Sequence, residues 1–347
     1  MKKILIQVQG MGKGKLFNPD ARDSYLEPCI YLRDRLKERG YQLETADDKS
    51  VEDCSWVWFW DFFEIDESEN PLLRMIKTLK HILKGRKQPV KTRSLHEELY
   101  EKCICAGMQD RIGLFIWEAP AISRATWNPK VHDLFPTILT WNDNYIDGKK
   151  FHKFCFPVTS YFPAVPEISF KDKKLLVNIS GNKFSSRSRE LYSARRKAIR
   201  YFERNQPDQF DLYGLGWDRR EKGFYPSYRG QLKHKWDVYP FYRFGLCYEN
   251  MRDEPGYITE KIFDCMRADC VPIYWGASNI TDYVDAEAFI DRRRFKSDAE
   301  LESFLVSMTE SEYEKYRQAI KSYLASDRFS AFLPPAFANT IIRAFRL

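Results

Sequence analysis

The residues best suited to contact a ligand follow a short strand-like run in the second half of the chain. Residues 244–250 (FGLCYEN) are apolar and β-rich, and the run ends on Glu249 and Asn250. In open α/β sheets, ligands bind beyond the carboxyl ends of the strands. The carboxylate and the amide at this strand end are therefore candidates for contact with a ligand.

A helix is expected shortly after that strand, and its first turn suits a diphosphate. Thr259 is a plausible N-cap for a helix over residues 259–267. Glu260 and Lys261 would then lie beside free backbone N–H groups and the positive end of the helix dipole. Lys261 would supply a full cation, and Tyr257 a flat face. An ordinary helix start with a Thr cap has the same pattern, so the Thr-Glu-Lys sequence alone is a weak signal.

Both halves of the chain alternate strand-like runs with helical stretches, which indicates parallel sheets. The first half has expected strands at 4–9, 41–45, 55–63, 111–117 and 138–141, and helices at 28–40 and 72–83. The second half has expected strands at 175–180, 210–214, 244–250, 270–276 and 288–291, and helices at 190–204, 259–267, 299–306 and 311–324. The length of 347 residues fits about two domains. We predict an α/β protein with two facing Rossmann-like domains, residues 1–158 and 175–347, joined by a linker at 159–174.

Three blocks of the second half resemble one known family. They are Tyr248-Glu249-Asn250, then Gly256-Tyr257-Ile258-Thr259-Glu260-Lys261, then Val271-Pro272-Ile273-Tyr274-Trp275-Gly276. In this order and at about this spacing they resemble the FEN, Y(V/I)TEK and VP(I/V)xxG blocks in the donor-binding region of the α1,3-fucosyltransferases, glycosyltransferase family 10. The resemblance is close over residues 175–300 and weaker over the N-terminal half.

This resemblance implies a GT-B fold, in which a cleft separates the two domains, and GDP-β-L-fucose as the donor. It implies that Glu260 contacts the fucose near its ring and that Lys261 holds the pyrophosphate. Asn250 and Tyr257 are implied as nucleotide contacts. Tyr248 and Thr259 belong to the same donor-binding block.

The family also has an Arg that binds phosphate, on the helix after a Ser-Asn or Ser-Gly strand end. Here Ser180-Gly181 marks that turn, and the helix that follows offers Arg195 and Arg196. Matching the residues that follow favours Arg196, with Arg195 close behind. The insertion at 183–190 leaves the choice between the two open.

Inverting sugar transfer needs a carboxylate that takes the proton from the acceptor hydroxyl. In the family this is the Glu of an E-S-P motif at a strand end, and Trp117-Glu118-Ala119-Pro120 occupies the corresponding place, with Ala119 in place of Ser. Between Trp117 and Pro120, we expect Glu118 to be partly desolvated, which would raise its pKa toward a useful value. We therefore predict Glu118 as the general base, and Glu260 as the group that steadies the positively charged sugar in the transition state.

Several other classes of protein are disfavoured. The eight cysteines and five histidines show neither zinc-finger spacing nor an HExxH pattern, and no Asp-x-Asp triad is present, so we expect no metal and no cofactor. Lys261, an Arg and a helix N-terminus would then neutralise the leaving GDP. No apolar run approaches the roughly 20 residues of a membrane span, and the N-terminus lacks the apolar region of a signal peptide. We therefore expect a cytoplasmic location.

The net charge of +7 favours an anionic partner. Basic residues cluster at 77–93 and at 187–200. The first cluster is either a solvated helix face or a peripheral contact with anionic membrane lipid. Neither cluster comes with a zinc finger or an RRM signature, so nucleic acid is not an expected partner.

The resulting prediction is an inverting, metal-independent fucosyltransferase that uses GDP-fucose and a glycan acceptor. The acceptor hydroxyl would belong to N-acetylglucosamine or glucose, with an α1,3 linkage. Two alternatives stay open. One is a GT-B enzyme with another nucleotide sugar, such as GDP-mannose, and the other is a non-catalytic module that binds glycans or polyanions.

Overall fold

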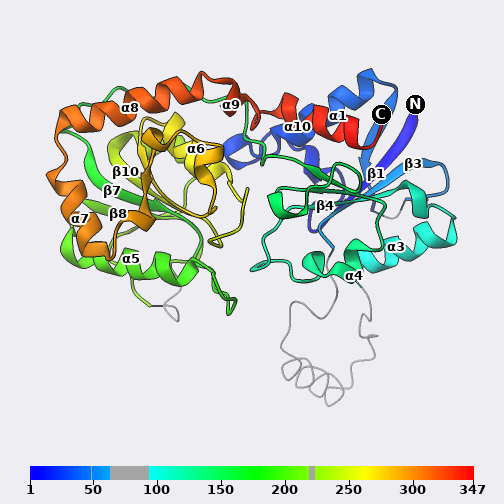
Figure 1. Cartoon of the computed structure of the whole chain (residues 1–347), viewed down its shortest axis with the longest axis horizontal. Helices are drawn as coiled ribbons and strands as arrows, with labels where there is room; N and C mark the ends of the chain where they lie inside the picture. The colour runs from blue at the N-terminus through cyan, green and yellow to red at the C-terminus, as the bar shows by residue number, and fades with distance from the viewer. Residues whose placement is uncertain (48, 63–93, 219–222) are drawn as a thin grey trace, which may run out of the picture.

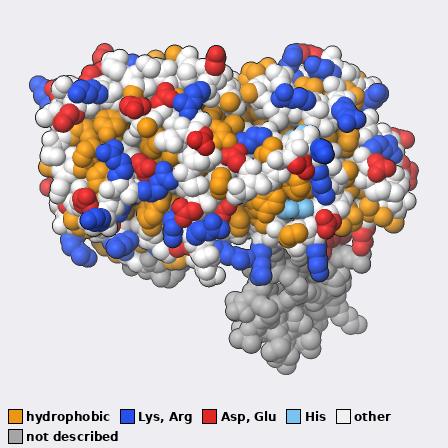
Figure 2. Space-filling view, viewed as in Figure 1, with side chains coloured by type: hydrophobic (Ala, Val, Ile, Leu, Met, Phe, Trp, Pro, Cys, Tyr) orange, Lys and Arg blue, Asp and Glu red, His pale blue; other side chains and the backbone are white. Residues whose placement is uncertain are grey.

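The computed structural model describes residues 1–47, 49–62, 94–218 and 223–347, which form two α/β domains side by side (Figure 1). The helix expected at 72–83 and the basic cluster at 77–93 lie outside these residues, as does the last residue of the strand expected at 55–63. Lys and Arg side chains border the lower part of the junction between the domains (Figure 2). Among the described residues, no helix is long and apolar enough to cross a membrane.

The N-terminal sheet has six parallel strands in the order β2-β1-β3-β4-β5-β6. Their bounds are β1 Lys2–Val8, β2 Tyr41–Thr45, β3 Cys54–Trp60, β4 Ile112–Ile116, β5 Thr137–Thr140 and β6 Phe151–Lys153. The helices described in this half are α1 Glu27–Glu38, α3 Leu95–Cys105 and α4 Pro129–His132. The five strands expected here are confirmed, whereas the sequence analysis missed α3, the short α4 and the short β6.

The C-terminal sheet also has six parallel strands, in the order β12-β11-β10-β7-β8-β9. Their bounds are β7 Lys174–Ile179, β8 Phe210–Tyr213, β9 Tyr228–Gly230, β10 Tyr242–Tyr248, β11 Val271–Trp275 and β12 Ile290–Asp291. The helices are α5 Tyr192–Asn205, α6 Glu260–Arg267, α7 Asp298–Ser307, α8 Glu310–Leu324 and the short α9 Asp327–Ser330. All predicted elements of this half are confirmed, and β9 is the strand that the turn-rich segment 216–231 concealed.

The central strands β3, β4 and β5 of the N-terminal sheet are mostly buried on both faces, as expected for a parallel sheet covered by helices. Trp58 and Phe115 face one apolar cluster, while their neighbours Val57 and Leu114 face another. This alternation follows from the two-residue period of a strand. Continuous apolar runs such as VWFW and GLFI therefore predicted these strands well.

The last helix, α10 Pro334–Ala344, requires a correction to the domain boundaries. We predicted that residues 175–347 would form the C-terminal domain, but after α9 the chain crosses back and α10 packs beside α1 on the N-terminal domain (Figure 1). Phe345 anchors this return, with its ring 4.8 Å from that of Trp58 and 5.9 Å from that of Phe115. Gly113 makes room for it, because a Cβ there would overlap the Phe345 ring. The apolar face of a helix does not reveal which of two domains it covers.

Candidate active site

The segment that follows β10 lies at the junction between the domains. Because all strands of each sheet are parallel, their carboxyl ends share one edge. From the C-terminal domain, the Tyr257 ring packs 4.6 Å from the ring of Trp141, which follows β5. The backbone N–H of Ala121, just after β4, donates to the Met251 sulfur at 3.1 Å. Residues after β4 and residues after β10 are therefore neighbours, although they are far apart in the sequence.

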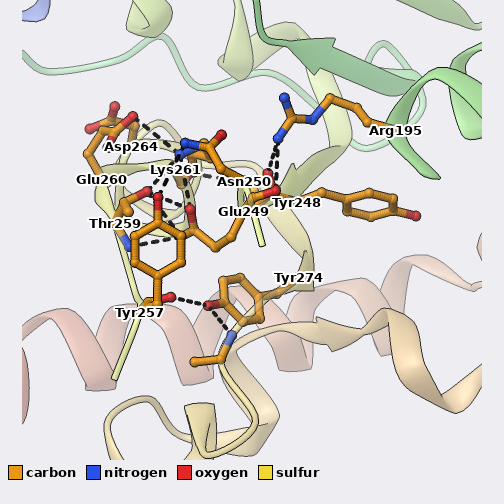
Figure 3. A network of polar contacts seen from close by, with 12 residues as sticks. Arg195, Tyr248, Glu249, Asn250, Tyr257, Thr259, Glu260, Lys261, Asp264 and Tyr274 are labelled. Atoms are coloured by element: carbon orange, nitrogen blue, oxygen red, sulfur yellow. Dashed lines mark hydrogen bonds and ion pairs between the residues drawn. The ribbon is translucent and has the colours of Figure 1, made fainter. Parts of the chain in front are cut away.

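Glu249 is the centre of the polar network in the predicted donor block (Figure 3). Its side chain is fully buried, and it accepts hydrogen bonds from the Thr259 N–H at 2.8 Å and from the Thr259 hydroxyl at 2.8 Å. The Lys261 ammonium donates to the same carboxylate at 3.0 Å. A buried charge needs such partners. One carboxylate thus ties the end of β10 to the start of α6, a role that the sequence analysis did not assign to it.

Thr259 occupies the predicted N-cap position of α6, but its hydroxyl does not cap the helix. The hydroxyl instead lies 2.8 Å from Glu249 Oε2 and 2.8 Å from the Lys261 ammonium. It therefore donates to the carboxylate and accepts from the lysine. The Thr259 side chain leaves the N–H groups of the first turn of α6 uncapped, which is what an anion site at a helix start requires.

Glu260 begins α6 and lies between two lysines. Its carboxylate is 3.5 Å from the Lys235 ammonium and 3.9 Å from that of Lys261. Burial raises the pKa of Glu260, but the two lysines lower it more, so the pKa lies well below its usual range. Glu260 is therefore ionised at neutral pH, as a role beside a developing positive charge demands. Lys235 was not among the predicted residues, because it belongs to the loop before β10 and carries no motif.

Arg195 and Arg196 point to different places. The Arg195 guanidinium is buried and donates to the carbonyls of Tyr248 at 2.5 Å and Glu249 at 3.0 Å, at the carboxyl end of β10. Arg196 donates to the carbonyl of Lys183 at 2.6 Å and lies over the exposed Phe184 ring. The geometry places Arg195, rather than the favoured Arg196, beside the donor block.

The remaining predicted donor residues differ in where their side chains lie. Asn250 donates to the Tyr257 hydroxyl at 3.2 Å, and Tyr257 is buried against Trp141. The Tyr248 side chain is also buried, but it points away from this network and packs with the Trp275 ring at 5.5 Å (Figure 3). Tyr248 therefore contributes its backbone carbonyl to the site rather than its phenol.

Glu118 follows β4 on the opposite side of the junction, on a scaffold of hydrogen bonds. The buried Asp61 carboxylate, at the end of β3, accepts from the N–H groups of Trp117 at 2.9 Å and Glu118 at 3.1 Å. The Trp127 indole donates to the Glu118 carbonyl at 2.8 Å. These bonds fix the backbone of the strand end, so the Glu118 side chain starts from a defined position. Asp61 was missed as a support, because only the fold brings the ends of β3 and β4 together.

The electrostatic surroundings of Glu118 come from the other domain. Burial raises the pKa of the Glu118 carboxyl above its usual range, while Lys183 and Lys261 act to lower it and Glu260 to raise it. Tyr192, the first residue of α5, is another neighbour that the sequence analysis missed. Burial raises its pKa to about 12, and its environment includes Arg195 and Glu118. Glu118, which follows β4, therefore interacts electrostatically with Tyr192 on α5 and with Lys261 on α6, across the domain junction.

Within the described part of the chain, no group of three or more His, Cys, Asp or Glu side chains is placed to hold a metal ion. Two cationic side chains of this site are those of Lys261 and Arg195. Both contact Glu249 at the end of β10: Lys261 donates to its carboxylate, and Arg195 donates to its backbone carbonyl.

Solved structures with the same architecture have been described. A crystal structure of an α1,3-fucosyltransferase aligns over 100% of this chain and 91% of its own, with a TM-score of 0.56 and 11% identity. A structure of an α1,3-fucosyltransferase with GDP-fucose aligns with a TM-score of 0.53 and 13% identity. The β-glucosyltransferase of phage T4 aligns over the full length of both chains, with a TM-score of 0.52 and 12% identity. Two facing parallel sheets with charged residues at their common edge define a GT-B glycosyltransferase fold.

The sequence narrows this class to a family. Residues 170–331 match the C-terminal sequence model of glycosyltransferase family 10, the fucosyltransferases. An α-(1,4)-fucosyltransferase of Arabidopsis thaliana is 38% identical over 82 residues, which are 22% of this chain and 20% of that protein. The α-(1,3)-fucosyltransferase FucT of Helicobacter pylori is 35% identical over 66 residues, 19% of this chain and 14% of its own. Residues 170–331 of this chain are therefore similar to glycosyltransferase family 10. The stretches matched in these two relatives span a fifth or less of each protein.

Proposed function

We propose that this protein transfers L-fucose from GDP-β-L-fucose to a hydroxyl group of an N-acetylglucosamine- or glucose-containing glycan, with inversion at the anomeric carbon and with an α1,3 linkage. The observation that carries the proposal is the contact between the N-terminal strand ends, where Glu118 follows β4, and the donor block after β10: Ala121, also after β4, meets Met251, and the Trp141 ring, after β5, meets that of Tyr257. A base on one domain and anion-binding groups on the other are what a single displacement between two bound substrates needs.

In this proposal the C-terminal domain holds the donor. The Lys261 ammonium, the Arg195 guanidinium and the uncapped first turn of α6 surround the place where the diphosphate would lie. As the bond to the sugar breaks, negative charge grows on the leaving GDP, and these fixed cations stabilise it. Such a site works without a metal ion, and activity should therefore persist in EDTA.

The N-terminal domain supplies the base. The raised pKa of Glu118 makes its carboxylate a better proton acceptor than an exposed glutamate. It takes the proton from the acceptor hydroxyl while the oxygen attacks the anomeric carbon from the face opposite the diphosphate. Glu260, which stays ionised, stabilises the positive charge that develops on the sugar ring.

The test is GDP release from GDP-fucose in the presence of EDTA, with N-acetyllactosamine-type acceptors and with GDP-mannose in parallel. We expect acceptor-dependent release from GDP-fucose, and the product's linkage can be read by NMR. GDP release from GDP-mannose, without release from GDP-fucose, would show that the donor is GDP-mannose. Binding of polyanions or glycans without release from either donor would overturn catalysis in favour of a binding module.

A further inference from the structure

The Glu249 carboxylate is bound by donors that all belong to the start of α6. Its own backbone N–H donates to the Trp275 carbonyl at 2.8 Å, so the pairing of β10 with β11 fixes its position. Removing a carboxylate from water is unfavourable unless it is paired and hydrogen-bonded. Glu249 satisfies this condition with Thr259 and Lys261, two residues of the donor block, and not with the body of the sheet.

The Thr259 hydroxyl has one proton, and its two neighbours decide how it is used. It donates to Glu249 at 2.8 Å, and the Lys261 ammonium donates to it at 2.8 Å. A threonine at an N-cap position normally accepts from the helix's own N–H groups. Here Glu249 draws the hydroxyl away from that role, and the Thr259 side chain does not cap α6.

Lys261 is surrounded by charged groups from four elements. Glu249 follows β10, Glu260 is on α6, Arg195 is on α5, and Glu118 follows β4 in the other domain. Burial lowers the pKa of Lys261, while Glu249 and Glu260 raise it more, so the pKa is above its usual range. Glu249 makes the direct contact, at 3.0 Å, whereas Glu260 lies at 3.9 Å.

We propose that Glu249 is a positioning residue of the donor site, which holds the Lys261 ammonium and the Thr259 hydroxyl so that both Lys261 and the first turn of α6 face the diphosphate. This role rests on the proposed function, because it needs a nucleotide diphosphate at this place. Glu249 does not touch the donor and acts through Lys261. It also keeps a buried lysine charged, so its removal should change how binding depends on pH.

The experiment is calorimetric titration with GDP of the full chain, from about pH 6 to about pH 10, a range that spans the acid side of an ordinary lysine. Glu249→Gln keeps the shape and an acceptor oxygen for Thr259, but it removes the charge. Burial then lowers the pKa of Lys261, and the lysine loses its proton at a lower pH. We expect affinity within about threefold of wild type near pH 6 and a loss of at least about tenfold, relative to wild type, by pH 9.5. Titration of the nucleotide itself is common to every variant and drops out of the comparison.

Asp269→Asn is the matched control. Asp269 forms another buried lysine pair in the same domain, 2.8 Å from the Lys173 ammonium, but it precedes β11 and so lies at the opposite edge of the sheet. Its variant should lose stability and keep the wild-type pH profile. Glu249→Asp, which retains the charge, should also lack the new alkaline loss.

The outcomes separate this role from the proposed function. If wild type does not bind GDP, the donor assignment fails and the role of Glu249 fails with it. If wild type binds GDP and Glu249→Gln follows its profile in parallel, only the positioning role is overturned. Should Glu249→Gln not fold, Thr259→Val removes the bridge between Glu249 and Lys261 and leaves both charges. It should weaken GDP binding several-fold at every pH, and unchanged affinity would again overturn the role.

Discussion

The two domains bring different surfaces to their common junction. On the C-terminal side, Glu249, Thr259 and Lys261 are joined by hydrogen bonds of 2.8–3.0 Å. On the N-terminal side, the single carboxylate of Glu118 stands on backbone hydrogen bonds and aromatic side chains. The family's sequence model matches residues 170–331, on the C-terminal side. Glu249, Thr259 and Lys261 of the proposed diphosphate site are close together in the sequence and form a short motif. The surface around Glu118 is built from the ends of separate strands and leaves no such motif.

The largest effect should come from the N-terminal side, where Glu118→Gln removes the proposed base. We expect acceptor-dependent GDP release to fall by about 10³-fold, with GDP binding retained, because a positioned base contributes roughly 10²–10⁴-fold. The raised pKa of Glu118 places the acid limb of the wild-type activity above the usual range of a glutamate, and activity is lost as the pH falls through it. Steady-state rates and titration with GDP separate the two effects.

The control for this variant is Glu254→Gln. Glu254 is also a buried acid with a pKa raised by burial, but its carboxylate pairs with Arg189 at 3.0 Å. Only its backbone carbonyl contacts a proposed donor residue, the Tyr257 N–H at 3.1 Å, and the substitution leaves that carbonyl in place. Its variant should keep most of the activity. If Glu118→Gln were as active as Glu254→Gln, the base would have to be another residue. The proposed division, with the base on the N-terminal domain and the donor site on the C-terminal domain, would then be wrong.

The next effect tests which domain the last helix stabilises. Phe345→Ala removes a ring that is 2% exposed, and such substitutions lower the free energy of unfolding by about 3–5 kcal/mol. Hydrogen exchange should show loss of protection in β3 and β4, with β10 and β11 largely unaffected. The exposed Val306 on α7 offers a control, since Val306→Ala should change the stability by less than about 0.5 kcal/mol. Equal loss of protection in both sheets would contradict this placement.

Much of the fold could be predicted from the sequence, for a physical reason. Parallel strands covered on both faces are continuous apolar runs, and runs such as 112–116 and 271–275 are buried throughout or nearly so. The return of α10 to the N-terminal domain could not be predicted, because it depends on how the Phe345 ring fits over Gly113. The short strands β6 and β9 gain their pairing from neighbours rather than from their own sequence.

The site shows the same division. The block 256–261 predicted an anion site at the start of α6, yet Thr259 was expected to cap a helix that it does not cap. For the arginine that we propose to bind phosphate, a usable signal was overlooked. Tyr192, Ala198, Ile199 and Phe202 form the buried face of α5, and Arg195 shares this face with them. Helical period thus favours Arg195 over its neighbour, where motif alignment across an insertion favoured Arg196.

Arg195 and Arg196 therefore give a sharper test within the C-terminal domain. Arg195→Lys keeps the charge but loses the planar fork that holds the end of β10, and we expect GDP affinity to fall by about tenfold, the equivalent of one charge-assisted hydrogen bond. Arg196→Lys should change it by less than about twofold, because Arg196 contacts the Lys183 carbonyl on an exposed loop. Calorimetric titration of both variants measures the difference. A larger loss of GDP affinity in Arg196→Lys than in Arg195→Lys would indicate that Arg196 binds the phosphate.

The smallest effect concerns the contact between the domains at Asp143. This carboxylate, in the N-terminal domain, accepts from Asn279 at 2.9 Å and from Tyr283 at 2.7 Å in the C-terminal domain, and it pairs with Lys153 at 2.6 Å. Burial raises the pKa of Asp143, but these three partners lower it more, so the pKa is below its usual range. Asp143→Asn should lower the free energy of unfolding by about 1 kcal/mol at neutral pH, since the carboxylate is part exposed and solvent screens it.

The sign of the pH dependence identifies this contact. A carboxyl group with a lowered pKa in the folded state contributes stability above its unfolded pKa of about 3.9, and that contribution is lost as the pH falls through the folded value. The difference in stability between wild type and Asp143→Asn should therefore be constant from pH 7 to about pH 5 and shrink in acid below that. Urea unfolding across this range measures it, with Asp34→Asn as the control, because Asp34 is exposed and pairs with Arg33 within α1. A difference that grew in acid would mean that Asp143 is held protonated, and the junction would then not be joined by charge.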